Sequence, residues 1–152
     1  MKSNLTNLRE FLRTAKKLPK KIRTPEVSRL ASDVSKFGFV RKKLTELQRK
    51  MAQRGKVIMD GRDIGTVVLP NADLKIFLTA SIEERAKRRF DELNAKGQTV
   101  ELAEIEKEIA ARDKQDSERE IAPLKKADDA ILLDTTNLTI EEVVDKILEL
   151  AR

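Results

Sequence analysis

The chain has 152 residues, enough for one domain with a hydrophobic core, and 38% of them are charged, which is typical of a protein with many solvent-exposed helical faces. It has no cysteine and no histidine, so disulfides, thiolate or histidine metal sites and the Ser-His-Asp triad are excluded. Chemistry must therefore rest on Asp, Glu, Lys, Arg and the backbone. Phosphoryl transfer suits that set because it needs mainly positioning and positive charge.

The net charge of +6 is concentrated at the N-terminus, where residues 1–23 carry +7 and the remainder carries −1. Residues 3–17 of this basic arm are predicted to form an amphipathic helix. A leader, an arm for acidic surfaces and a solvated helix without a specific role all fit the pattern. Because the basic charge belongs to the arm alone, no specific nucleic-acid partner is expected. No apolar run is long enough to span a bilayer and no secretory signal is present, so we expect a cytoplasmic protein without a membrane partner.

Two amphipathic helices are predicted before the first strand. The TPE segment at 24–26 is typical of a helix start, with the threonine as N-cap, and Gly38 is expected to break this helix. A second helix is predicted over 39–53 and is closed by Gly55.

A strand-forming run at 56–60 leads directly into Asp60-Gly61-Arg62-Asp63. The run is predicted to be a buried strand, and ligands of α/β proteins bind just beyond the carboxyl ends of such strands. Two carboxylates and a guanidinium at this point would suit a charged ligand. A solvated polar turn is the simpler interpretation of these four residues taken alone.

The rest of the chain alternates helices with two more strands, which are predicted over 74–78 and 130–133. Capping boxes at 81–84 and 139–142 indicate two helix starts. Helices are predicted over the segments 82–96, 101–112 and 140–152. This alternation predicts an α/β fold with a parallel sheet.

Three charged residues, Arg112, Asp116 and Arg119, follow at spacings of four and three. If this segment is helical, they place two guanidiniums around a carboxylate on one face, and arginine matches phosphate oxygens well. Surface ion pairing, worth about 0.2–0.5 kcal/mol per pair, is the plainer interpretation. Arg85 and Arg89 are also four apart, and their repulsion would be relieved if they shared an anion.

Four segments, in this order and at this spacing, resemble the bacterial cytidylate kinase family. They read IRTPEVS at 22–28, DGRDIGTVV at 60–68, ADLKIFLTAS followed by EERA at 72–86, and RDKQDSER followed by APL at 112–124. The resemblance implies an α/β fold like that of P-loop nucleoside-monophosphate kinases, with three layers in which helices cover both faces of a parallel sheet. Residues 1–21 form a basic arm unlike the family, and 22–152 are predicted to form a single domain.

The resemblance also implies an activity, the transfer of a phosphoryl group from ATP to CMP or dCMP with Mg²⁺, giving ADP and CDP or dCDP. Ser32, Arg41 and Asp63 resemble the residues that read the cytosine ring. Asp116 resembles the contact to the sugar.

The remaining site residues are also implied by the resemblance. Three arginines resemble the family's clamp on the phosphates: Arg62, Arg112 and Arg119. Arg85 and Arg89 fall in the lid region. Asp60 resembles an acidic strand end that holds magnesium through water.

The chain departs from the family in having no P-loop, because none of its five glycines forms G-x-x-x-x-G-K-[ST]. In the family's sheet the P-loop strand lies between the strands that resemble 56–60 and 74–78, so the core is predicted to be incomplete and to lack that strand. Each unsatisfied buried backbone group costs about 1–3 kcal/mol, against a total stability of about 5–15 kcal/mol. We therefore expect marginal stability, aggregation through open strand edges, or a partner that supplies the P-loop half.

Kinase activity of this chain alone is expected to be below detection, because the ATP phosphates have no recognisable cradle. A truncated product of a normal kinase and an inactive module that binds a nucleoside monophosphate both fit the sequence. An interaction protein that uses its basic N-terminal helix is the alternative from another functional class.

Overall fold

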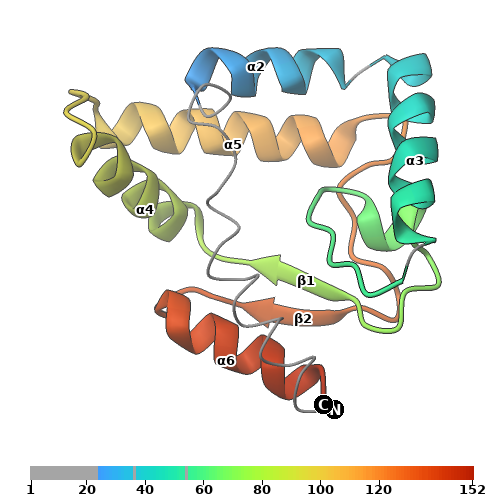
Figure 1. The fold of residues 1–152 in the computed structure, drawn as a ribbon. Helices are drawn as coiled ribbons and strands as arrows, with labels where there is room; N and C mark the ends of the chain where they lie inside the picture. The colour runs from blue at the N-terminus through green and yellow to red at the C-terminus, as the bar shows by residue number, and fades with distance from the viewer. Residues whose placement is uncertain (1–23, 36, 54) are drawn as a thin grey trace. The chain divides into compact units, whose positions relative to one another are not determined.

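The computed structural model describes residues 24–35, 37–53 and 55–152 (Figure 1). The helix predicted over 3–17 lies outside these residues. The chain divides into two compact units, one comprising Met1–Leu47 with Leu138–Arg152 and the other Gln48–Asn137. No helix in the described part combines the length and apolar character needed to cross a membrane.

The unit Gln48–Asn137 contains a two-stranded parallel sheet, formed by β1 (Ile76–Thr79) and β2 (Ile131–Asp134). The register pairs the first residue of β1 with the first of β2 and continues in step to their ends. Both strands were predicted, and the α/β class is confirmed. Parallel strands are normally covered on both faces, yet Leu78 and Leu132, which point to opposite faces, are both at least half exposed.

Two helices follow β1, α4 (Ile82–Asn94) and α5 (Leu102–Glu118), and they pack side by side (Figure 1). Gly97 takes a φ of 75° in the connection, as expected for a glycine just beyond a helix end. The apolar faces of the two helices form a small core. Its members are Ala86, Leu93 and Ile105, with Phe90, Val100 and Ile109 packed against them.

Helix α5 continues six residues beyond its predicted end at 112 and includes most of the polar segment 113–119. No Gly or Pro interrupts this segment, and its side chains make tertiary ion pairs, from Asp113 to Arg85 and from Asp116 to Arg62. These contacts stabilise helical backbone where apolar periodicity gave no signal.

The strand predicted over 56–60 does not form, and this prediction was wrong. Residues 57–60 are irregular and have no ladder partner among the described residues, and the side chains of Val57 and Ile58 are exposed. A strand needs a neighbour that pairs with its N–H and C=O groups, and the sheet of the described residues consists of β1 and β2 alone. The following apolar run forms a single π-helical turn, η3 (Ile64–Val68).

The described part of the other unit includes α2 (Pro25–Val34) and most of α3 (Gly38–Ala52). Thr24 caps α2 as predicted, since its hydroxyl accepts a hydrogen bond from Val27 N at 3.2 Å. Gly38, expected to be a break, is instead the first residue of α3. The apolar stripes of these helices are largely exposed, at Leu30, Val34, Phe39, Leu44 and Leu47.

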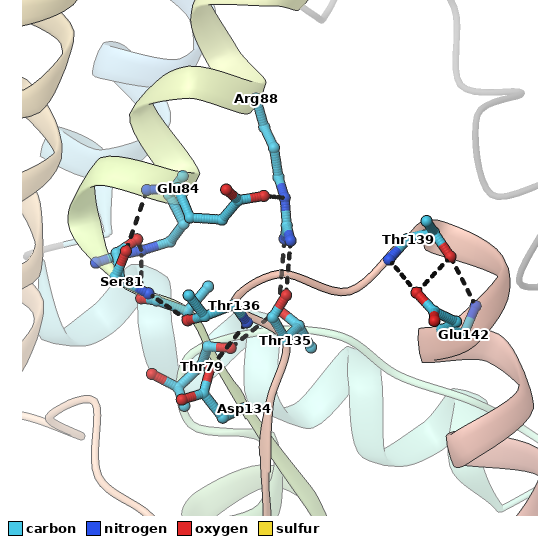
Figure 2. A network of polar contacts seen from close by, with 11 residues as sticks. Thr79, Ser81, Glu84, Arg88, Asp134, Thr135, Thr136, Thr139 and Glu142 are labelled. Carbon is cyan, nitrogen blue, oxygen red and sulfur yellow. Dashed lines mark hydrogen bonds and ion pairs between the residues drawn. The ribbon is translucent and has the colours of Figure 1, made fainter.

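The final helix, α6 (Ile140–Leu150), also belongs to this unit. Thr139 and Glu142 form the complete capping box that the sequence predicted, with hydrogen bonds in both directions (Figure 2). The buried residues of α6 are Val144 and Leu148. The predicted stripe through positions 143, 147 and 150 lies beside this buried face, partly covered at its first two positions and exposed at its last.

Candidate functional site

The turn Asp60-Gly61-Arg62-Asp63 connects the irregular segment to η3. Asp60 is exposed, and a Cβ at Gly61 would lie 3.0 Å from Ile64 Cγ1, so a larger residue there would require the Ile64 side chain to shift. Asp63 is the N-cap of η3, and its carbonyl accepts hydrogen bonds from the backbone N–H groups of positions 67 and 68. The turn is therefore held at its last residue, and its glycine packs closely against Ile64.

Three of the predicted residues come together at the end of α5. Arg62 Nε donates to Asp116 Oδ2 at 2.7 Å, and Arg119 Nη1 lies 3.5 Å from Asp116 Oδ1. Position 62 reaches this cluster from 54 residues away in the sequence. Two guanidiniums around one carboxylate leave a surplus of one positive charge, which favours an anion as the ligand.

Burial in this cluster is uneven. The side chain of Asp116 is only 7% exposed, and that of Arg119 is 13% exposed, whereas that of Arg62 is 43% exposed. Asp116 and Arg119 are thus largely buried, whereas nearly half of the Arg62 side chain is exposed to solvent. An incoming anion would meet Arg62 first.

The chain after α5 is bent around Arg119. Arg119 Nε donates to the carbonyl of Ala122, and Leu124 N donates to the carbonyl of Asp116 at 2.7 Å. Ala122 adopts a φ of 53°, a left-handed conformation that costs a non-glycine residue about 1–2 kcal/mol. Strained backbone of this kind persists where surrounding contacts hold it, often beside a functional site.

The other predicted arginines are placed differently. Arg112 lies on α5 and is exposed. Arg85 forms a two-pronged ion pair with Asp113, at 3.0 and 2.6 Å, and its Nε donates to the carbonyl of residue 80. Arg89 pairs with Glu92 at 3.1 Å on the same helix. The structure thus brings Arg85 to α5, and it pairs Arg89 locally.

A second polar network lies where the two strands end (Figure 2). Buried Thr135 donates through its hydroxyl to the carbonyl of Thr79 at 3.0 Å, and its own carbonyl accepts from Arg88 Nη2 at 2.7 Å. Ser81 caps α4 as predicted, but the predicted capping box is not completed, because the Glu84 carboxylate accepts from Arg88 Nε instead of from the backbone of Ser81. These bonds tie the start of α4 to both strand ends.

The carboxylate of Asp134 belongs to the same network. Hydrogen bonds from the hydroxyl and backbone N–H of Thr136 lower the pKa of Asp134 below its ordinary value. Asp134 is therefore a fixed negative charge at the carboxyl end of β2, the position where ligands of parallel sheets bind.

Ser32 and Arg41 lie in the other unit, on α2 and α3. The carbonyl of Ser32 accepts from the Ser35 hydroxyl at 2.7 Å, and Arg41 Nη1 donates to the carbonyl of Ser35 at 3.4 Å. Both residues are partly buried, and Ser35 links the end of α2 to the first turns of α3.

Among the described residues, no group of three or more acidic side chains gathers as a metal cage. A magnesium ion does not require one, because it keeps several waters and is commonly held by one or two carboxylates and the substrate phosphates. The exposed carboxylate of Asp60 is compatible with that arrangement.

Sequence reasoning missed two side chains that hold the site. Asp113 is the partner of Arg85, 28 residues away, and Arg49 donates to the carbonyls of Val67 and Val68. Neither pair has a local signature, because a lone charge on a helix looks the same whether or not it has a distant partner. The presence of Asp113 in the family segment that begins at Arg112 was the nearest sequence signal for the Arg85–Asp113 pair.

Comparison with known proteins identifies the family to which the chain belongs. The family model described as cytidylate kinase matches residues 2–152. A cytidylate kinase from Carboxydothermus hydrogenoformans is 61% identical over 129 residues, covering 85% of this chain and 58% of the relative. Those from Thermosipho melanesiensis and Bacillus licheniformis are 54% and 58% identical, over 93% and 85% of this chain. The chain spans between 57% and 65% of the length of these relatives.

Proposed function

Because the chain belongs to the cytidylate kinase family, we propose that it forms the nucleoside-monophosphate side of an enzyme that transfers a phosphoryl group from ATP to CMP or dCMP. The products are ADP and CDP or dCDP. The chain spans less than two thirds of the length of these relatives, so we infer the activity, the substrates and the partner of the whole enzyme from the family.

The observation that carries this proposal is the cluster of Arg62, Asp116 and Arg119. The buried carboxylate fixes both guanidiniums, and the half-exposed Arg62 leaves donors for an anion. A phosphate arriving there meets a surplus of positive charge that is already oriented, which is the main contribution of a protein to phosphoryl transfer. Arg112, exposed on α5 one turn before Asp116, is the third member of the proposed phosphate clamp.

The base and sugar are assigned to other residues of the family motifs. We assign recognition of the cytosine ring to Ser32, Arg41 and Asp63, and the contact to the sugar to Asp116. A carboxylate accepts a hydrogen bond from the cytosine amino group, whereas uracil presents an acceptor at the same position. Asp63 is therefore the residue that separates CMP from UMP.

Magnesium and ATP complete the proposed reaction. Asp60 would hold the ion through water, and the ion would bridge and neutralise the phosphate oxygens when bound. Arg85 and Arg89 remain assigned to the lid region. The residues of this chain orient the acceptor phosphate and neutralise its charge.

A partner that carries the P-loop half is part of the proposal. The sequence contains no P-loop pattern, and a P-loop supplies the backbone N–H groups that hold the ATP phosphates. The segment at 57–60, which is irregular and has exposed apolar side chains at Val57 and Ile58, supports a further strand as the missing neighbour, and the half-exposed apolar side chains of β1 and β2 support additional cover of the faces of the sheet. We expect no CMP-dependent release of ADP from ATP by this chain alone.

Calorimetric titration with CMP and with cytidine tests the proposed binding side. We expect millimolar or tighter binding of CMP and a loss of at least tenfold in Arg62→Met. Cytidine, which has no phosphate, should bind equally well to both proteins. Lys107→Gln, an exposed change on α5, is the matched control and should bind CMP like the wild type. Absence of CMP binding at millimolar concentration would overturn the proposal.

A further inference from the structure

Arg49, in the last turn of α3, bridges two consecutive backbone carbonyls of η3. Its Nη2 donates to the carbonyl of Val67 at 2.6 Å, and its Nε donates to the carbonyl of Val68 at 3.1 Å. A planar guanidinium can make both bonds at once, whereas an ammonium is a point charge. The contact joins residues 18 and 19 positions apart.

The two peptide groups that Arg49 binds are the ones that close the turn. The Val67–Val68 peptide donates its N–H to the carbonyl of Asp63 at 3.1 Å, and the Val68–Leu69 peptide donates its N–H to the carbonyl of Ile64 at 2.7 Å. A cation on each carbonyl polarises the peptide and strengthens the bond made by its N–H. Arg49 therefore strengthens the hydrogen bond that the Val67–Val68 peptide donates to the carbonyl of Asp63.

A π-helical turn needs such support. Five-residue π segments are rare, and they are found mostly as single turns, frequently at functional sites. Val68, at the end of η3, is buried, so the C-terminal end of the turn is fixed by packing as well as by Arg49. Asp63, at the other end, inherits its position from this turn.

We propose that Arg49 is a positioning residue that determines the preference of this site for cytosine over uracil. It holds the turn that presents Asp63, and it acts without contacting the nucleotide itself. The inference rests on the proposed function, in which Asp63 reads the amino group of the base.

The test compares the dissociation constants of CMP and UMP by calorimetry in the wild type, Arg49→Gln and Arg49→Lys. In Arg49→Gln the ratio of the UMP dissociation constant to the CMP dissociation constant should fall at least fivefold. Displacement of the Asp63 carboxylate should weaken CMP binding, whereas the affinity for UMP should change little. Arg49→Lys should recover part of the ratio. Lys50→Gln removes the same charge from the neighbouring position of the same turn and should keep the ratio within twofold.

A merely structural role for Arg49 predicts a different result. Destabilisation of the fold would weaken CMP and UMP by the same factor and leave the ratio unchanged, which would overturn the inference. Circular dichroism of each variant establishes that it is folded under the conditions of the titration.

Amide hydrogen exchange provides an arm that needs no ligand. In Arg49→Gln the N–H groups of Val68 and Leu69 should exchange at least tenfold faster, while those of α4 and α5 keep their rates. Unchanged exchange would overturn the inference whatever the titrations show. If the wild type binds neither CMP nor UMP, the proposed function fails and the specificity role of Arg49 fails with it, even where exchange shows that Arg49 holds the turn.

Discussion

Replacing Asp116 by asparagine removes the charge at the centre of the arginine cluster and keeps the size of the side chain. Asp116 is 7% exposed and accepts a charge-assisted hydrogen bond from Arg62 at 2.7 Å, a type of bond worth about 1.5–3 kcal/mol. Breaking a fully buried ion pair costs about 3–5 kcal/mol. The lower range applies because Arg62 is 43% exposed and can be solvated, and because the less exposed Arg119 keeps its hydrogen bond to the carbonyl of Ala122.

A smaller effect opposes this loss. Asp116 lies in the last turn of α5, where a negative charge meets the negative end of the helix dipole, and its removal regains about 0.3–1 kcal/mol. The net loss in the free energy of unfolding should therefore be about 0.5–2.7 kcal/mol. For a chain of this length that corresponds to a decrease of about 1–11 °C in the melting temperature.

Urea unfolding followed by circular dichroism measures this change, because the chain has no Trp or Tyr to serve as a fluorescent probe. Asp91→Asn, an exposed change on α4, is the control and should stay within about 0.5 kcal/mol of the wild type. An unfolding midpoint of Asp116→Asn equal to that of the wild type would show that the cluster does not contribute to stability.

Three further outcomes are expected. Hydrogen bonds from Lys75 lower the pKa of Asp129 below its ordinary value of 3.8. This pair therefore stabilises the fold at pH values above 3.8, and the stabilisation is lost as the pH falls below that value. Urea midpoints measured from neutral to acidic pH should fall less steeply in Lys75→Met than in the wild type. Thr139→Ala removes the cap of α6 and should cost about 1 kcal/mol, detected as an earlier thermal transition in circular dichroism. Leu132→Lys places a charge on an exposed sheet residue, and light scattering should show less aggregation at an unchanged unfolding midpoint.

Local signals in the sequence predicted the helices and two of the strands. The caps at Thr24, Ser81 and Thr139 are formed where the residue types indicated them. These features depend on hydrogen bonds within four residues. The strand at 56–60 failed because its formation depends on a neighbouring strand, and no local pattern shows whether that neighbour is present.

The candidate site was predictable in part. Arg62, Asp116 and Arg119 were singled out by their residue types and by the family motifs, and the structure brings them together. The roles of Asp113 and Arg49 were not predictable, because each depends on a partner at least 18 residues away. Polar contacts of this kind follow from the tertiary fold and carry no periodicity of their own.

The register of the parallel sheet also sets the order in which this chain can fold. Each residue of β1 pairs with one 55 positions later, and both α4 and α5 lie between them. Closing an unstructured loop of that length costs about 3.5 kcal/mol plus a constant, whereas α4 and α5 are neighbours in sequence and need only a short connection. We therefore expect the helical pair to form first and shorten the loop, with strand pairing as the late and slower step. Mutations in the α4–α5 core would then slow folding, and mutations in β2 would mainly speed unfolding.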